Sequence, residues 1–133
     1  MTAKEKIANI EISSHLAGCV AFVTATCHAL AKESGWWDNL LPPQQGAVAE
    51  KLLLIHSEVS EATEGYRKGL QDDHLPHRSM VEVELADALI RICDLAGAMN
   101  LDLGGAVAEK LAYNAKRADH KPENRAKEGG KKF

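Results

Sequence analysis

Two pairs of acidic residues are the feature of this sequence best suited to chemistry. Glu58 and Glu61 are three positions apart, and so are Glu84 and Asp87. Two side chains at that spacing share one face of a helix. The stretch between the pairs has room for a helix end, a loop and a return, so we expect neighbouring antiparallel helices whose acidic faces meet. Carboxylate oxygens suit Mg²⁺ and Mn²⁺, and Mg²⁺ commonly completes its coordination with phosphate oxygens. The spacing therefore predicts a divalent-cation site suited to a nucleotide polyphosphate.

An exposed, solvated helix face is the ordinary explanation for acids at helical spacing, and spacing alone leaves both interpretations open. The surroundings of Asp87 favour the cation site, because Asp87 lies within the otherwise apolar segment 85–90. An ionised carboxylate in such a segment needs a partner. Arg91, one turn beyond Asp87, is expected to orient a carboxylate.

A polar stripe in the last helical segment supplies the opposite charge. Lys110, Asn114 and Arg117 follow one another at spacings of four and three, with Tyr113 beside them. The two cations can neutralise phosphate oxygens and the amide can donate a hydrogen bond. An ordinary exposed helix face explains the same stripe, so both interpretations stay open here too.

Several aromatic and histidine side chains are further candidates. Trp36 and Trp37 are adjacent in an expected loop, where they can stack on a nucleobase or anchor the loop. His28 can line the same pocket, although a satisfied core histidine is the simpler interpretation. His74 and His77 lie in a proline-containing loop and are poor support for zinc, since a zinc site needs more ligands.

The elements that must position these residues are helical. Apolar side chains recur at steps of three and four in each of four segments, which is the helical period. The third segment has the widest apolar surface and opens with Ser79 and Glu82 at capping-box spacing. Gly69 and Asp102 are expected to end the second segment and to cap the fourth. The four segments run from about 16 to 34, 44 to 68, 79 to 100 and 102 to 117.

Composition agrees with one small helical domain. Apolar residues make up 45% of the 133-residue chain and aromatic residues only 5%, which favours helices packed on helices. We therefore expect an all-α, four-helix-bundle-type domain over residues 1–117 and a basic, solvated tail over 118–133. The net charge of −3 argues against a general nucleic-acid binder, which normally carries a basic excess.

The remaining features indicate a cytoplasmic protein. Cys19, Cys27 and Cys93 fall within apolar helical patterns and are interpreted as small buried hydrophobes in a reducing compartment. We expect no stretch to span a membrane, since none approaches the roughly 18 uncharged apolar residues that a membrane-spanning helix needs. The N-terminus does not resemble a signal peptide.

The acidic pairs, with the spacer between them, resemble the signature of the all-α nucleotide pyrophosphohydrolases, the MazG-like proteins and their dCTP- and dUTP-cleaving relatives. The resemblance extends over residues 56–69, 84–91 and 110–117 and to the closing Gly-Lys-Lys-Phe at 130–133. It covers the chain from about residue 45 to the end. Ser57 is a departure, because many members carry a third acid there, and Glu64 or Asp94 are candidates to replace it.

The resemblance implies a Mg²⁺-dependent hydrolase in which Glu58, Glu61, Glu84 and Asp87 bind the cation. Water would attack the α-phosphorus of a nucleoside triphosphate, releasing a monophosphate and pyrophosphate, in the service of nucleotide-pool house-cleaning. By the same resemblance, the polar stripe of the last helical segment would contact the phosphates.

Two alternatives differ in function. The first is an enzyme of similar fold that cleaves phosphoribosyl-ATP, and the second is a non-catalytic helical interaction module. The wide apolar surface of the third segment also predicts a homo-oligomer, a dimer or tetramer, since such a helix needs neighbours on several sides. MazG-like chains pair in the same way. No membrane or nucleic-acid partner is expected.

Overall fold

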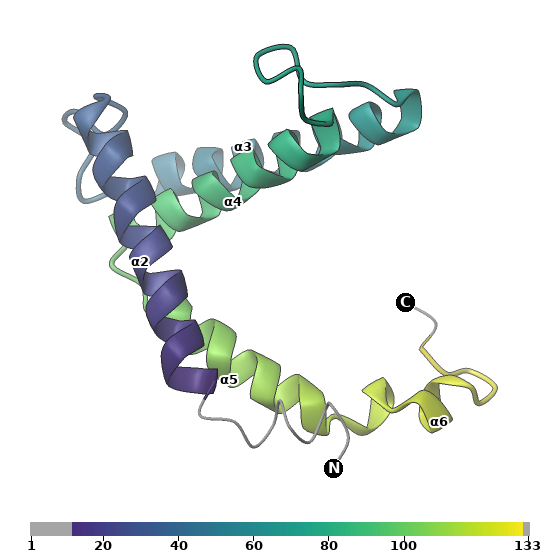
Figure 1. Cartoon of the computed structure of the whole chain (residues 1–133). Coiled ribbons are helices and arrows are strands. Elements are labelled where there is room, and N and C mark those ends of the chain that lie inside the picture. The colour runs from purple at the N-terminus through teal and green to yellow at the C-terminus, as the bar shows by residue number, and fades with distance from the viewer. Residues whose placement is uncertain (1–11, 132–133) are drawn as a thin grey trace. The chain divides into compact units, whose positions relative to one another are not determined.

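The computed structural model describes residues 12–131, and every regular element in that range is a helix (Figure 1). The prediction of an all-α chain with four long helical segments is confirmed, whereas the four-helix-bundle arrangement stays a prediction. The four long helices are α2 (Ile12–Glu33), α3 (Gln45–Lys68), α4 (Met80–Ala98) and α5 (Leu103–Lys116), followed by a 3₁₀ turn, η1 (Ala118–His120), and the short α6 (Pro122–Arg125).

Two expectations concern residues outside this range. The interpretation of the N-terminus as lacking a signal peptide falls on residues 1–11, and the closing motif includes Lys132 and Phe133. Both lie outside the described residues.

The helix ends form where the sequence predicts them, because the capping groups are in place. The side chain of Ser79 accepts a hydrogen bond from the backbone N–H of Glu82, and Glu82 accepts one from the backbone N–H of Ser79. Gly69 ends α3 with φ 63°, a left-handed conformation that glycine adopts without strain. Asp102 caps α5 by accepting a hydrogen bond from the N–H of Gly105.

The chain divides into two compact units. One is Phe22–Leu101, and the other combines Met1–Ala21 with Asp102–Phe133. The first unit contains the acidic pairs and both tryptophans. The second contains α5, η1 and α6.

Within the first unit, α3 and α4 lie side by side and pack along their length (Figure 1). A Cβ atom on Gly65 would lie 2.8 Å from Cβ and Cγ of Met80, so the missing side chain lets the start of α4 approach α3 closely. Ala62 of α3 and Ala88 of α4 are buried. Small residues thus bring the two helices together and fix how their acidic faces meet.

The loop between α3 and α4 is held by its own hydrogen bonds. Asp72 is buried, and its Oδ2 accepts hydrogen bonds from the backbone N–H groups of His74 (2.8 Å) and Leu75 (2.6 Å). The N–H of Asp72 donates to the carbonyl of Arg78, and that of Met80 donates to the carbonyl of Leu70. The loop therefore places a carboxylate close to the acidic end of the helix pair.

The outer face of α4 differs from the sequence expectation. The apolar stripe predicts that Leu85 and Ile92 face inward, yet they are 53% and 38% exposed. The buried apolar side chains of α4 are mostly smaller ones, Ala88, Cys93 and Ala96, together with Leu95. The prediction was wrong because neither α3 nor any other described segment covers the part of α4 that carries Leu85 and Ile92.

Two further expectations need correction. Cys93 is buried and Cys27 half-buried, as expected, but Cys19 is exposed. The segment Ser14–Glu33 of α2 is long and apolar enough to cross a membrane by length and composition, so the expectation that no stretch approaches this limit was wrong. Core helices of soluble proteins meet the same criteria, and the cytoplasmic location stays a prediction.

We expect Gly65→Ala to destabilise the protein by about 1–3 kcal/mol, because the added methyl group overlaps the Met80 side chain. This cost exceeds the gain of up to about 1 kcal/mol that alanine brings to a helix. Gly18→Ala on α2 is the matched control, since a Cβ there meets nothing within 4 Å, and it should be neutral or stabilising. Urea unfolding measures both variants. Equal effects would show that α3 and α4 do not approach at Gly65 as described.

Candidate metal centre and adjoining pocket

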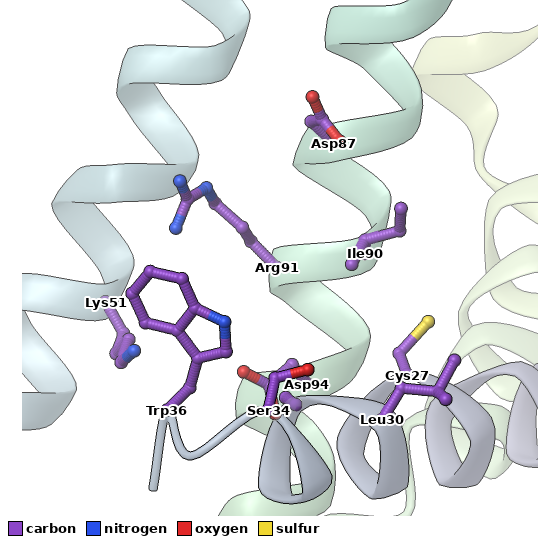
Figure 2. A pocket seen from close by; sticks show the side chains of 10 residues that line it. Cys27, Leu30, Ser34, Trp36, Lys51, Asp87, Ile90, Arg91 and Asp94 are labelled. Atoms are coloured by element: carbon purple, nitrogen blue, oxygen red, sulfur yellow. The ribbon is translucent and has the colours of Figure 1, made fainter.

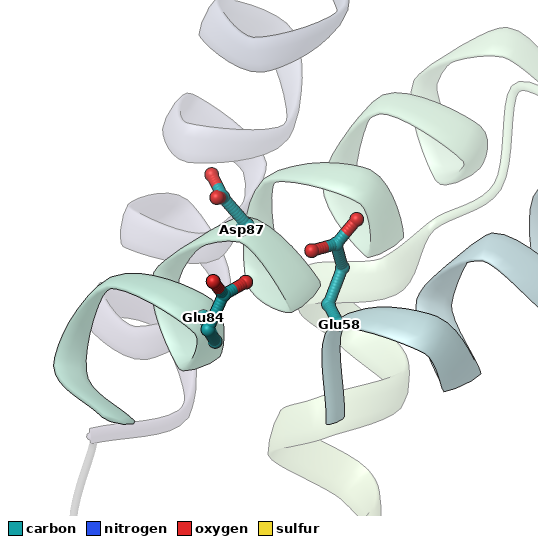
Figure 3. A group of neighbouring side chains, drawn as sticks. All are labelled: Glu58, Glu84 and Asp87. Carbon is teal, nitrogen blue, oxygen red and sulfur yellow. The ribbon is translucent and has the colours of Figure 1, made fainter. Parts of the chain in front are cut away.

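Three carboxylates from the helix pair converge on one point (Figure 3). Glu58 of α3 and Glu84 and Asp87 of α4 each offer an oxygen atom, and these atoms lie within 4.8 Å of one another. Glu58 and Glu84 are buried, at 7% exposure each, and Asp87 is half-buried. Glu84 and Asp87 share a face because they are three residues apart on one helix, and the close approach of α3 adds Glu58.

The convergence is electrostatically costly. Burial, together with a hydrogen bond to Glu58 and the charges of Glu61, Glu58 and Asp87, raises the pKa of Glu84 to about 7. Burial and the nearby Glu58 also raise the pKa of Asp87. The Oε2 atom of Glu84 is buried and has no hydrogen-bond partner. A buried, unpartnered carboxylate oxygen beside two others fits a hard divalent cation, which prefers oxygen ligands.

Arg91 supplies the one cation in direct contact with these three residues, as far as the described chain shows. Its Nε donates to Oε1 of Glu58 at 2.5 Å. The contact holds the Glu58 carboxylate toward α4 and partly offsets the charge of the group. The predicted role of Arg91 in orienting a carboxylate is confirmed, and the carboxylate is Glu58.

The fourth predicted ligand, Glu61, lies outside this group of three. It is exposed, but close enough for its charge to contribute to the raised pKa of Glu84. It lines a cavity of about 550 Å³ together with Glu84, Asp87 and the loop residue Asp72. The structure therefore brings three of the four predicted acids together and leaves Glu61 exposed at the edge of the cavity that Glu84 and Asp87 also line.

The two candidates for an additional carboxylate have other partners. Glu64 is paired with Arg67 and Lys68 on the surface of α3. Asp94 bonds to His28 and Trp37, as described below for the second cavity. Neither belongs to the acidic group. His74 and His77 are likewise absent from any cluster of metal-ligating side chains in the described residues.

A second cavity, of about 400 Å³, adjoins the acidic group through Asp87 (Figure 2). Asp87, Arg91 and Asp94 follow one another along α4 on one side of it, and the indole of Trp36 stands beside them. Lys51 of α3 completes the polar lining. The volume is in the range of small-molecule sites, and the lining offers an aromatic ring, two cations and two carboxylates.

The structure separates the two tryptophans. Trp36 lines the cavity and is 67% exposed, whereas Trp37 is 3% exposed and is not part of the lining. Trp37 donates from Nε1 to Asp94, and Lys51 lies over its ring at 4.8 Å from the centroid. Trp36 is thus the available stacking surface, and Trp37 is the loop anchor.

His28 is a satisfied, part-buried histidine, as the simpler interpretation expected. Its Nδ1 lies 2.9 Å from Oδ1 of Asp94, and its ring meets the edge of Trp37 at a centroid distance of 5.8 Å. Sequence reasoning missed Lys51 and the central place of Asp94 in this network. Asp94 was detectable, because it lies between the apolar residues Cys93 and Leu95 just as Asp87 lies in an apolar segment.

The polar stripe of α5 belongs to the other unit, where its two cations lie over the ring of Tyr113. Lys110 Nζ lies 4.8 Å and Arg117 Cζ 5.8 Å from the centre of that ring. The Oδ1 atom of Asn114 is buried without a hydrogen-bond partner. Lys110 and Tyr113 are exposed, so these contacts lie on the surface of α5 and leave both interpretations of the stripe open.

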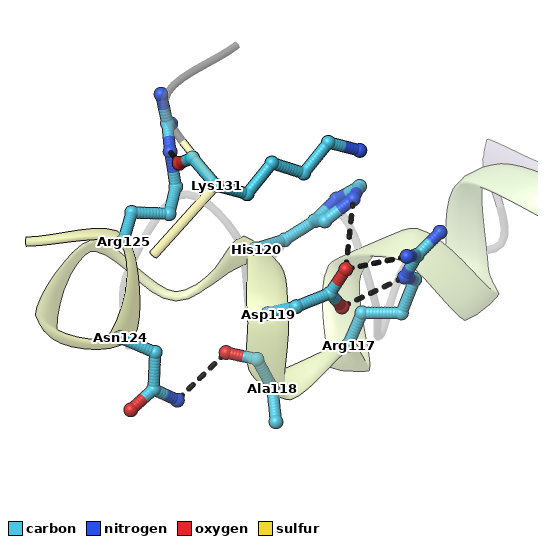
Figure 4. Close-up of polar contacts among 7 residues, drawn as sticks. All are labelled: Arg117, Ala118, Asp119, His120, Asn124, Arg125 and Lys131. Carbon is cyan, nitrogen blue, oxygen red and sulfur yellow. Dashed lines mark hydrogen bonds and ion pairs between the residues drawn. The ribbon is translucent and has the colours of Figure 1, made fainter. Parts of the chain in front are cut away.

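Arg117 already has a carboxylate partner, which sequence reasoning missed. It donates from Nε and from its terminal guanidinium nitrogen to Asp119 of η1 (Figure 4). This pairing raises the pKa of Arg117 and lowers that of Asp119. Further along the tail, Asn124 donates to the carbonyl of Ala118. In the described chain the pairing with Asp119 uses Nε and one of the two terminal nitrogens of Arg117.

Comparison with protein-family models, with curated proteins and with solved structures found no match to this chain.

The raised pKa of Glu84 predicts how the metal-free protein responds to pH. Between the ordinary value of 4.5 and about 7, the folded state keeps a proton that the unfolded state has lost. Stability therefore falls as pH rises through this window and stays low above it. We expect Glu84→Gln, measured with a chelator present, to flatten this dependence and to exceed the wild type at about pH 8 by on the order of 2 kcal/mol.

Glu82→Gln is the control, because Glu82 is an exposed acid on the same helix and glutamine can still close the capping box. It should keep the wild-type pH dependence. Thermal unfolding across this pH range decides the matter. A Glu84→Gln variant that tracks the wild type at every pH would contradict the raised pKa.

Proposed function

We propose that this chain is a Mg²⁺-dependent nucleoside triphosphate pyrophosphohydrolase, releasing a monophosphate and pyrophosphate. The observation that carries the proposal is the convergence of Glu58, Glu84 and Asp87, with the unpartnered buried oxygen of Glu84, beside a cavity lined by Trp36. A cation-binding carboxylate group next to an aromatic, cation-lined cavity suits a molecule with a polyphosphate at one end and a base at the other. The resemblance to MazG-like proteins supports the same activity.

The three converging carboxylates would hold the cation. When bound, it supplies charge neutralisation for the phosphate oxygens and makes an attacking water more acidic. Manganese can take the same place, because its preference for oxygen ligands is similar.

The chain's own residues supply the remaining functions. Arg91 keeps Glu58 turned toward the group through its bond to Oε1. Glu61, at the rim and exposed, is available to accept the proton that a water loses on attacking the α-phosphorus. Trp36 offers its exposed ring for stacking of the base. The predicted phosphate contacts of Lys110, Asn114 and Arg117 rest on the resemblance alone.

We also propose that the working unit is a homo-oligomer, a dimer or tetramer. Within the described chain, α4 leaves four large apolar side chains exposed: Leu85 at 53%, Leu89 at 53%, Ile90 at 48% and Ile92 at 38%. Exposed apolar surface of this kind marks interaction sites, and a second copy would bury it, which light scattering would report as a mass above that of one chain. A role in nucleotide-pool house-cleaning and a cytoplasmic location belong to the same proposal.

We expect Asp87→Asn to lower Mg²⁺-dependent pyrophosphate release from nucleoside triphosphates by at least about 100-fold, because it removes one of three converging charges. Its metal-free thermal stability should hold or rise, since repulsion among the acids is relieved. Primary products of the wild type should be monophosphate and pyrophosphate. A diphosphate with orthophosphate would indicate a different hydrolase.

Glu64→Gln serves as the matched control on α3, because Glu64 pairs only with Arg67 and Lys68 in the described chain. It should retain wild-type turnover. Unchanged activity of Asp87→Asn would overturn the cation-site assignment. A wild type that releases no pyrophosphate from any nucleoside triphosphate, or from phosphoribosyl-ATP, would favour the non-catalytic interaction module.

A further inference from the structure

The second cavity is lined by a carboxylate, Asp94, whose orientation is fixed by Trp37 and His28. Oδ1 of Asp94 accepts a hydrogen bond from Nε1 of Trp37 at 2.8 Å and lies 2.9 Å from Nδ1 of His28. In the described chain Oδ2 of Asp94 accepts no hydrogen bond, although Asp94 lines the cavity. One oxygen is therefore used to orient the side chain, and the other remains available to a ligand.

The orientation of Asp94 is determined by buried groups. Trp37 is 3% exposed, and the side chains of His28 and Asp94 are each 13% exposed. Rotating the Asp94 carboxylate would break both contacts to Oδ1 at once. The acceptor is thus positioned before any ligand arrives, which lowers the ordering cost of binding.

The position of Asp94 along α4 suits contact with the base of a nucleotide whose phosphates lie at the acidic group. Asp87, which belongs to the acidic group, and Asp94 both line the cavity, with Arg91 between them (Figure 2). Seven residues of helix span about 10 Å along its axis. A nucleotide spans a distance of this order between its 5′-phosphate and the outer edge of its base, and the exposed ring of Trp36 lines the same cavity.

Given the proposed pyrophosphohydrolase activity, we propose that Oδ2 of Asp94 selects bases with an exocyclic amino group, cytosine or adenine, over their keto counterparts. An ionised carboxylate only accepts hydrogen bonds. The N4 amino group of cytosine and the N6 amino group of adenine donate, whereas uracil and hypoxanthine present a carbonyl oxygen at the corresponding position. Two acceptors facing each other repel, so a keto base leaves the carboxylate unpaired at a cost.

Two cationic donors compete with Asp94 in this cavity: Arg91, whose Nε donates to Glu58, and Lys51. The ammonium of Lys51 lies over both indoles, 5.8 Å from the centre of Trp36 and 4.8 Å from that of Trp37. A lysine donor would favour a keto oxygen. Because Lys51 is engaged by the two rings, while Oδ2 of Asp94 has no partner in the described chain, the assignment to Asp94 predicts the opposite preference.

The experiment compares matched pairs of substrates that differ only in an amino or a keto group: CTP with UTP, dCTP with dUTP, and ATP with ITP. With the full chain and Mg²⁺, we expect kcat/KM to favour the amino member by at least about 10-fold. Asp94→Asn keeps an acceptor for Trp37 and presents an amide donor in place of Oδ2. It should reduce this ratio at least about 10-fold or reverse it.

Asp38→Asn is the control, since Asp38 is an exposed acid in the loop that carries Trp36 and Trp37 and does not line the cavity. It should leave the ratio unchanged. The wild-type ratio needs no variant, so it decides the matter even if Asp94→Asn does not fold. Turnover without an amino preference, or with a keto preference, overturns the role of Asp94.

A binding readout separates this inference from the proposed activity. CMP and UMP, or AMP and IMP, are titrated against tryptophan fluorescence, which reports contact with Trp36. Tighter binding of the amino member without any turnover would support the role of Asp94 and contradict the hydrolase. Turnover with equal binding and equal kcat/KM within each pair would support the hydrolase and contradict the role of Asp94. If the protein shows no turnover and no binding, both proposals are contradicted.

Discussion

Packing α3 against α4 brings Glu58, Glu84 and Asp87 within 4.8 Å of one another, in a place where Glu58 and Glu84 are almost fully buried. Like charges at that distance repel, and burial removes the water that would otherwise screen them. The chain relieves part of this cost with Arg91 and part by raising the pKa of Glu84 to about 7. A bound divalent cation, as we propose, would offset the rest. A helix pair that served stability alone would gain from apolar residues at these positions, and this cost is one reason why we propose a binding role for the acids.

α4 links the acidic group to the cavity beside it. Asp87 belongs to both, Arg91 reaches across to Glu58, and Asp94 is fixed by Trp37 and His28. A bound molecule would therefore meet a cation-binding end and a hydrogen-bonding end on a single rigid helix. Sites on regular elements keep their geometry better than sites on loops. Trp36, which would stack on the base, and Trp37, which holds Asp94, are loop residues.

Much of this could be predicted from the sequence, because the relevant signals are local. Ser79 with Glu82, Gly69 and Asp102 mark helix ends through their own hydrogen bonds and backbone conformations. The meeting of the two acidic faces could be predicted from helical spacing and from the single loop that connects the two helices.

What could not be predicted depends on contacts between distant residues. Adjacent tryptophans look alike in sequence, and only the partner Asp94 decides which one is buried. Glu61 has the same spacing from Glu58 as Asp87 has from Glu84, yet the way α3 meets α4 leaves it at the rim. The exposure of Leu85 and Ile92 follows from what covers α4, which periodicity does not report.

Binding of Mn²⁺ in the absence of nucleotide tests the central claim most directly, because it needs no assumption about the substrate. Free aqueous Mn²⁺ gives a strong electron paramagnetic resonance signal that weakens when the ion is held by a protein. At about pH 8, where Glu84 is expected to be ionised, the wild-type chain should remove the signal stoichiometrically, and so should Glu64→Gln. Glu84→Gln should leave most of the signal free. A wild type that leaves the signal unchanged, or a Glu84→Gln variant that binds as the wild type does, would contradict a cation site at Glu58, Glu84 and Asp87.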